Sequence, residues 1–216
     1  MQQEWIEAET PTDGVLYEVV STEIGPVAIG AKGLVIAERD DHEWTTVVPA
    51  GPATDRNELF AADVTDDNKR VWFAGSSGAL GCYDVETGRK HDYTAPKEKT
   101  STWEAIAVTG DRRAERLRVA NGSGEILSMR ADDYGCPQWE SVTEPGMGTT
   151  IRTMDGHEGR FYAADTTGHV FEEADGTWTR IGIENAQVEF LDLQATDDHL
   201  YITGEDGRFF RYDRDC

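Results

Sequence analysis

Three carboxylates stand within short apolar segments whose alternating pattern predicts β-strands: Asp63, Glu104 and Asp192. Two carboxylates on either side of a sugar can hydrolyse a glycosidic bond, one as acid and the other as nucleophile or base. The chain, however, contains 42 Asp and Glu residues in 216, so carboxylates within strands are expected without catalysis. We therefore expect no catalytic residues, and a glycoside-active enzyme is the less favoured alternative.

The other residue types that do chemistry are scattered. No two histidines stand at the spacing of metal ligands, and the adjacent Asp pairs fall at predicted turns, where solvated residues are common. The recurrent Gly-x-x-Gly pattern never opens a helix, which a phosphate-binding loop requires. The sequence therefore predicts neither a metal site nor a cofactor.

A few large or cationic side chains are candidates for contact with a partner or ligand. Arg56, Trp103 and Arg152 lie in or beside connections that precede the predicted innermost strands. A second group, Arg112, Arg113 and Arg116, lies in a long turn of an otherwise acidic chain. Arginine forms two parallel hydrogen bonds with carboxylates, so this turn is suited to an acidic partner, with local ion pairs as the alternative.

The elements that must position these residues follow from an internal repeat. A small apolar strand, a residue, then Gly, Asn or Asp, two residues and Gly, and a second apolar strand recur five times. The closing glycines are 39 to 46 residues apart: Gly33, Gly78, Gly124, Gly168 and Gly207. Repeats of this length built from short strands are typical of β-propeller blades. The sequence predicts an all-β, five-bladed β-propeller.

We expect one domain over residues 1–216, in which each blade has four strands. The fifth repeat lacks an outer strand, and residues 3–9, which contain Trp5, have the pattern of one. We therefore predict that this N-terminal strand completes the last blade and closes the ring, which removes two free sheet edges. The expected blades are 15–49, 59–94, 103–143, 151–183, and 190–216 plus 3–9.

Two outer-strand tryptophans follow a short motif. Asp133-Tyr134-Gly135 precedes Trp139, and Asp175-Gly176 precedes Trp178. These segments resemble the degenerate Asp-box, or BNR-like, repeats of sialidase-type propellers, and the chain looks like the broad WD40/YVTN/BNR-like group of haloarchaea. The resemblance implies a propeller fold and no particular activity. A sialidase site would need several axial arginines with a Tyr–Glu pair; only Arg56 and Arg152, with Tyr17-Glu18, are candidates, so we do not expect that activity.

The charge indicates the medium and excludes some partners. A formal charge of −22 with five lysines resembles the surfaces of extremely halophilic proteins, in which molar salt screens carboxylate repulsion. The same charge argues against nucleic acid, because phosphate contacts need Lys and Arg. Three unrelated cysteines, no signal peptide pattern and no long apolar run predict a cytoplasmic protein without membrane insertion, or part of a particle assembled inside the cell.

Together these observations predict a non-catalytic propeller that serves as a scaffold for protein–protein interaction in a halophilic archaeon. Such a scaffold would suit a larger assembly or a virus particle, with a protein as the expected partner. The alternative is a lectin-like propeller that binds a glycan or another small ligand. That alternative predicts a pocket repeated in each blade, which the sequence does not display.

Overall fold

The computed structural model describes residues 5–39, 42–53, 55–183 and 186–214, and these form five antiparallel sheets. The first sheet contains β1 (Leu16–Thr22), β2 (Gly25–Gly30), β3 (Val35–Glu38) and β4 (Trp44–Val48). The second contains β5 (Leu59–Val64), β6 (Arg70–Gly75), β7 (Leu80–Asp84) and β8 (Lys90–Asp92). The third contains β9 (Trp103–Thr109), β10 (Arg116–Asn121), β11 (Ile126–Ala131) and β12 (Pro137–Thr143).

The remaining two sheets follow the same order, with one strand fewer in the last. The fourth contains β13 (Ile151–His157), β14 (Arg160–Asp165), β15 (Val170–Ala174) and β16 (Thr177–Arg180). The fifth contains β17 (Phe190–Ala195), β18 (His199–Gly204) and β19 (Arg208–Asp213). The all-β prediction is confirmed, and each sheet coincides with one predicted repeat.

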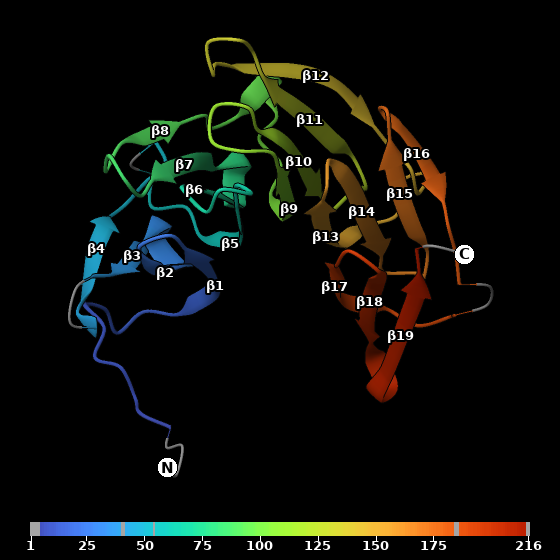
Figure 1. Cartoon of the computed structure of the whole chain (residues 1–216), viewed down its shortest axis with the longest axis horizontal. Coiled ribbons are helices and arrows are strands. Elements are labelled where there is room, and N and C mark those ends of the chain that lie inside the picture. The colour runs from blue at the N-terminus through green and yellow to red at the C-terminus, as the bar shows by residue number, and fades with distance from the viewer. Residues whose placement is uncertain (1–4, 40–41, 54, 184–185, 215–216) are drawn as a thin grey trace.

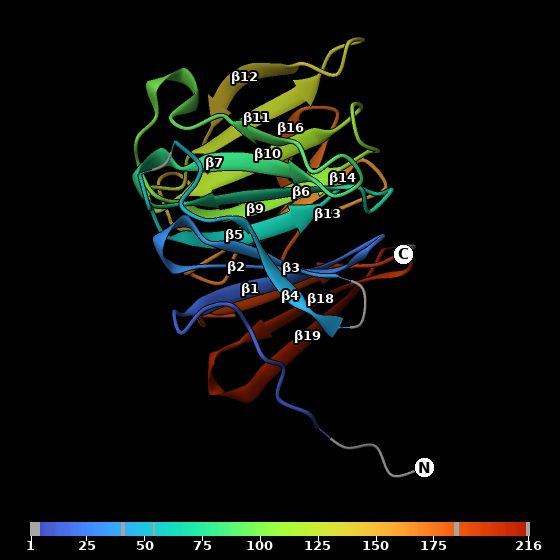
Figure 2. The ribbon, with the colours of Figure 1, turned by 90° about the vertical axis from the view of Figure 1, so that its left-hand side faces the viewer.

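The first strands of the five sheets lie side by side around the middle of the molecule (Figures 1 and 2). β1 packs on β5, β5 on β9, β9 on β13 and β13 on β17. Four clusters of buried apolar side chains lie between adjacent sheets, one in each of these interfaces. The core is thus a series of sheet-to-sheet contacts, and it holds the first strands in a fixed relation to one another.

The repeated turn connects the second and third strands of every sheet. Its closing glycine has a positive φ in all five copies, from 69° to 88°, as the sequence pattern predicts. The glycine that opens the turn in the second sheet is fixed for another reason. Gly75 has an extended backbone, but a Cβ there would lie 1.8 Å from the carbonyl oxygen of Glu58. This turn therefore sits directly against the start of the first strand.

The predicted ring closure is not confirmed. The described part of the N-terminal segment, residues 5–15, contains no strand, and Trp5 and Ile6 are almost fully exposed. No packing comparable to that of the other neighbours joins β17 to β1 among the described residues. The N-terminal segment has few apolar side chains and extends away from the sheets (Figure 1). Residues 3–4 and 215–216 of the predicted last blade lie outside the described residues.

A seam therefore separates the first sheet from the fifth. Most of the large exposed apolar side chains among the described residues belong to residues 5–24, β17 and β19; the exceptions are Tyr134 and Met147. In the described part of the chain, no helix is long and apolar enough to cross a membrane.

Candidate functional site

Each of the five first strands has an irregularity at the same position. The pairing with the second strand shifts by one residue near the start of β1, β5, β9, β13 and β17. The residue without a direct partner differs in every sheet: Tyr17, Phe60, Glu104, Arg152 and Leu191. Bulges of this kind turn a side chain out of the ladder and are frequent beside binding sites.

All five bulge residues line one cavity of about 580 Å³ between the first strands, which we call the axial pocket. The rings of Tyr17 and Phe60 meet edge to face, with centroids 5.2 Å apart. The Tyr17 hydroxyl donates a hydrogen bond to Glu58, and the Arg152 guanidinium lies 3.9 Å from Glu189. The five first strands thus place two aromatic rings, a carboxylate, a guanidinium and an aliphatic side chain around one cavity.

Deeper in the axial pocket, carboxylates connect neighbouring sheets. Asp63 accepts hydrogen bonds from the backbone N–H of Val64, in its own strand, and of Val108, in the next sheet, at 2.7 and 2.6 Å. Asp155 repeats this arrangement with Gly156 and Ala195 at 2.8 and 2.7 Å. Each aspartate satisfies one amide on either side of a sheet-to-sheet interface. These contacts assign both carboxylates a structural role.

Three carboxyl groups of the axial pocket, including Asp63 and Asp155, lie in surroundings that oppose ionisation. Burial raises the pKa of Glu18 to about 7, with a further contribution from the charge of Asp192, against a lowering by the Ala62 amide. Burial, followed by the charge of Asp155, holds the pKa of Asp63 well above its usual value, and burial also raises the pKa of Asp155. The axial pocket is therefore lined by carboxyl groups of which several resist ionisation, mainly because they are buried.

The sequence analysis grouped Arg56, Trp103 and Arg152 as candidate contact residues, and the structure places them in different surroundings. Arg152 is partly exposed and lines the axial pocket, as expected of a contact residue. Arg56 is exposed but does not line that pocket. Trp103 is 1% exposed and packs in the cluster between the second and third sheets, so the expectation that a partner could reach it is corrected. Transfer of its large apolar ring from water into the protein interior is favourable in free energy, which explains why the side chain is buried.

The arginine turn is engaged within the molecule. Arg112 donates two hydrogen bonds to the Asp84 carboxylate, at 2.8 and 2.9 Å, and approaches Glu86. Arg113 donates to the backbone carbonyl of Tyr134. Arg116 donates to the carbonyl of Gly159 and lies 3.7 Å from Glu173. These internal contacts favour the alternative of local ion pairs over docking of an acidic partner.

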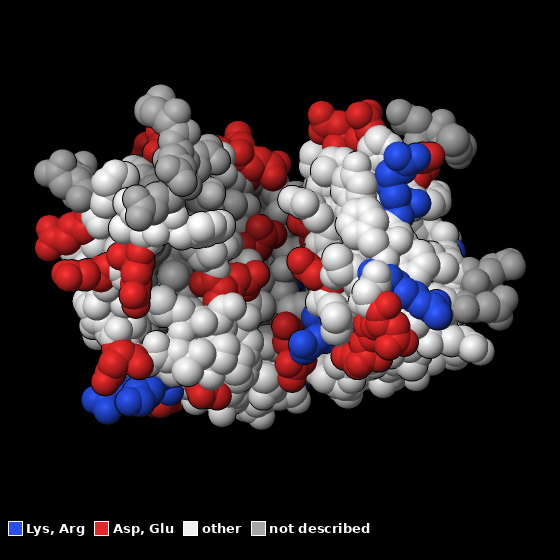
Figure 3. Space-filling model, turned by 90° about the horizontal axis from the view of Figure 1, so that it is seen from below, with Lys and Arg blue, Asp and Glu red and all other residues white. Residues whose placement is uncertain are grey.

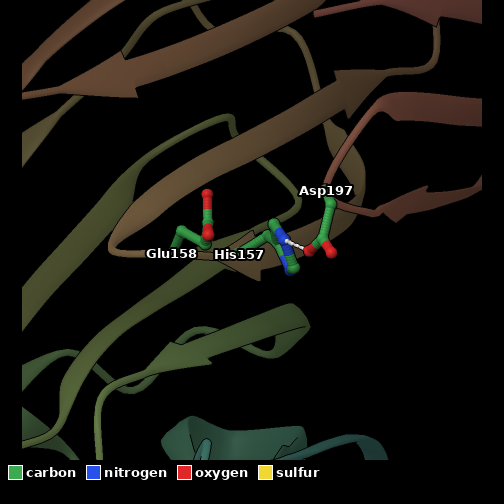
Figure 4. Close-up of side chains that lie close together, drawn as sticks. All are labelled: His157, Glu158 and Asp197. Atoms are coloured by element: carbon green, nitrogen blue, oxygen red, sulfur yellow. Dashed lines mark hydrogen bonds and ion pairs between the residues drawn. The ribbon is translucent and has the colours of Figure 1, made fainter.

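One group of possible metal ligands was not visible in the sequence. His157 and Glu158 lie in the β13–β14 turn and come close to Asp197 of the next sheet, with ligand atoms within 4.8 Å of one another. The His157 Nε2 contacts Asp197 at 2.8 Å, and Glu158 stands beside this pair (Figure 4). Both carboxylates are exposed, and we interpret the group as a surface ion pair.

Sequence reasoning found Arg152, Glu104 and Asp63 but not the pocket that unites them. The signal that was available is the position directly after the first apolar residue of each first strand. At that position the repeats disagree completely, while the preceding residue is a large apolar one in every repeat. Variable positions on a repeated frame are typical of binding surfaces.

Comparison with families gives no assignment: no family model and no curated protein matches the chain. Solved structures do match. A catalytically inactive virginiamycin B lyase from Staphylococcus aureus, with quinupristin, has a TM-score of 0.71 at 12% identity, over 93% of this chain and 67% of that one. YCF48 from Cyanidioschyzon merolae has a TM-score of 0.70 at 12% identity, over 94% and 70%.

A third match, U3-55K, has a TM-score of 0.75 at 8% identity; it covers 94% of this chain, which spans 62% of that protein. At these identities the likeness shows the fold alone. These neighbours are β-propeller-type proteins, and the five antiparallel sheets of this chain match their all-β fold. Neither the haloarchaeal relation nor the BNR-like character of the repeats has support from these matches.

Proposed function

We propose that this chain is a non-catalytic propeller scaffold that binds a protein partner at the mouth of the axial pocket, in a high-salt medium. The observation that carries the proposal is the ring of five bulge residues. A repeated frame presents a different side chain from each blade at one end of the axis. Substitutions there alter a contact surface without altering the frame.

The carboxylates support a role in binding rather than in catalysis. Asp63 and Asp155 each accept two backbone amides, one of them from the next sheet, which assigns both carboxylates a structural role. The sheets also have short connections, which leave little room for the insertions that build deep catalytic sites. Such connections suit contact with a protein surface at the mouth.

A photocrosslinking experiment tests this proposal. A photoreactive amino acid replaces Phe60 at the mouth in one variant and Thr179, exposed on β16, in a matched control. In extract of the native cell at its own salt concentration, we expect the Phe60 probe to capture a defined protein that the Thr179 probe does not. Adding Arg152→Glu should change the yield of this product, because it reverses a charge at the mouth. Equal capture by both probes would refute a partner site at the mouth.

We also propose that the five blades form a complete ring, closed by the N-terminal segment. In three sheets, a tryptophan of the outer strand stands opposite an equivalent residue of the third strand: Trp44 opposite Glu38, Trp139 opposite Met129 and Trp178 opposite Glu173. The equivalent residue of the fifth sheet is Tyr212, which pairs with Leu200 as Met129 pairs with Leu117.

Among the described residues, no outer strand lies beside Tyr212. Instead it lines an apolar pocket of about 630 Å³, together with Ile181, Ile183 and Phe210. Trp5 is fully exposed and lies in a segment with the length of an outer strand. Pairing of residues 5–8 with β19 would place the indole in this pocket and cover the free edge of the sheet.

Hydrogen exchange measured by mass spectrometry tests the closure. In the full chain, amides of residues 208–213 should be protected, and Trp5→Ser should increase their exchange rate at least about tenfold. The matched control, Tyr134→Ser, removes an exposed aromatic residue far from β19 and should leave those amides unchanged. Protection that is the same in the Trp5→Ser variant and the parent protein would refute closure by this segment.

A further inference from the structure

The axial pocket has the composition of a site for a positively charged group. Its volume of about 580 Å³ lies within the range of small-ligand pockets. Five carboxylates line it, against a single cationic side chain, that of Arg152; they are Glu18, Asp63, Glu104, Asp155 and Asp192. Seen from below Figure 1, the surface is hollowed between its two halves, and Asp and Glu side chains face the hollow from both sides (Figure 3).

The negative charge of the axial pocket is not compensated from within. In the described part of the chain, no lysine or arginine forms an ion pair with any of the five carboxylates, and Arg152 is directed toward Glu189, outside the pocket lining. Glu18 accepts one backbone amide through Oε2, and Asp192 accepts the Leu193 amide through Oδ1. A carboxylate has about four acceptor positions, so acceptors remain for a ligand.

The spacing of the carboxylates selects the type of cation. Among the described residues, only the His157 group brings three possible ligands within the 4.8 Å that one metal ion would need. The axial carboxylates do not converge in this way, so a single bare ion cannot contact three of them at once. An extended organic cation can, and the rings of Tyr17 and Phe60 offer it an aromatic wall.

We propose that the axial pocket binds an alkylammonium group, with its charge toward the carboxylates and its methylenes against Tyr17 and Phe60. The group comes either from a small diamine or from a lysine side chain of a protein. The inference rests on the proposed scaffold function, and it names the chemistry by which a partner is recognised at the mouth. The raised pKa of Glu18 is consistent with this inference, because a bound ammonium group would supply the counter-ion that favours the ionised carboxylate.

Calorimetry with defined probes tests this inference on the full chain. The probes are putrescine and a blocked Gly-Lys-Gly peptide, with succinate and a neutral disaccharide as controls, at pH 8 and moderate salt. We expect saturable binding of at least one ammonium probe and none of the controls. Near pH 7, binding of an ammonium probe should also release protons from the protein, because the positive charge of the probe favours ionisation of Glu18. The apparent heat will then depend on the ionisation enthalpy of the buffer.

Variants locate the binding. Glu104→Gln should weaken binding of the ammonium probe about tenfold, because one facing charge is lost. Phe60→Leu should also weaken this binding, because leucine keeps an apolar side chain but removes the aromatic face. The matched control, Glu205→Gln, removes an exposed carboxylate outside the pocket and should bind as the parent protein does. Circular dichroism of each variant confirms that the strands are retained.

The outcomes are distinct. Binding of putrescine alone identifies a small diamine as the source, and binding of the peptide identifies a protein lysine; both support the inference. No binding of either probe at millimolar concentration, equal affinities of Glu104→Gln and Glu205→Gln, or binding of the disaccharide would overturn it. The proposed scaffold function does not fall with it, since capture of a partner by the Phe60 photoprobe is measured independently.

Discussion

Glu18 makes the stability of the chain depend on pH in a predictable direction. Its pKa is about 7 in the folded protein against 4.5 for a free side chain. Because the folded value is the higher one, the protonated carboxyl contributes fully below pH 4.5, and the contribution is lost as the pH rises through 7. The difference corresponds to about 3 kcal/mol, at ~1.4 kcal/mol for each tenfold change in acidity.

The substitution Glu18→Gln should remove this dependence. Glutamine keeps a carbonyl oxygen that can accept the Ala62 amide, and it does not ionise. We expect the variant to be about 3 kcal/mol more stable than the parent protein at pH 8.5 and nearly equal to it at pH 4.5. Urea unfolding at both pH values and constant salt measures the two differences.

The control for this experiment is Glu98→Gln, which removes an exposed carboxylate. It reports the effect of lowering the net charge by one, and we expect a similar small difference from the parent at both pH values. The reasoning would be refuted if Glu18→Gln gave the same stability difference at pH 4.5 and pH 8.5, or if it destabilised the protein at the higher pH. Either result would mean that Glu18 ionises without cost in the folded state.

Three further predictions concern the packing between blades. Arg118→Leu should destabilise the chain by about 3–5 kcal/mol in urea unfolding, because it leaves the buried Glu173 carboxylate without the guanidinium that donates to it at 2.6 and 2.9 Å. Gly75→Ala should lower the thermal midpoint by at least about 4 °C, since the added methyl would overlap the Glu58 carbonyl. Cys82 should not react with a thiol reagent at pH 8 until the protein unfolds, because burial raises its pKa to about 12.

Each of these has a control within the chain. Arg130→Leu removes an exposed partner of Glu140 and should cost less than about 1 kcal/mol. Gly88→Ala meets no atom within 4 Å and should cost only the local strain of its positive φ. Cys136 is exposed and should react at once with the thiol reagent. A variant that behaves like its control would contradict the corresponding argument.

The repeat predicted the sheets well because its signals are local. Alternating apolar residues and a turn glycine at positive φ act within a few residues of one another, and every predicted second and third strand is present. Tyr93 shows where the pattern misled. An aromatic residue near the outer strand suggests the place of the tryptophan, but Lys90 stands opposite Tyr83 at the equivalent position, and Tyr93 stacks on Trp72 instead.

The site was harder to predict because its contacts join distant parts of the chain. The backbone amide of the next sheet that donates to Asp63 is 45 residues away in the sequence. His157 and Asp197, which are in contact, are separated by 40 residues. Periodicity locates a strand but does not show which side chain a bulge turns toward the axis. For this reason Arg152 was found by its charge, whereas Tyr17 and Phe60 were not recognised as part of a pocket.

The position of the five bulges has a consequence for protein engineering. A bulged residue forms no regular pair with the neighbouring strand, so its identity is nearly independent of the hydrogen bonds that hold the blade. A library randomised at positions 17, 60, 104, 152 and 191 would therefore vary one contiguous face while it retained the fold. Selection from such a library is expected to yield binders for new targets on the same frame.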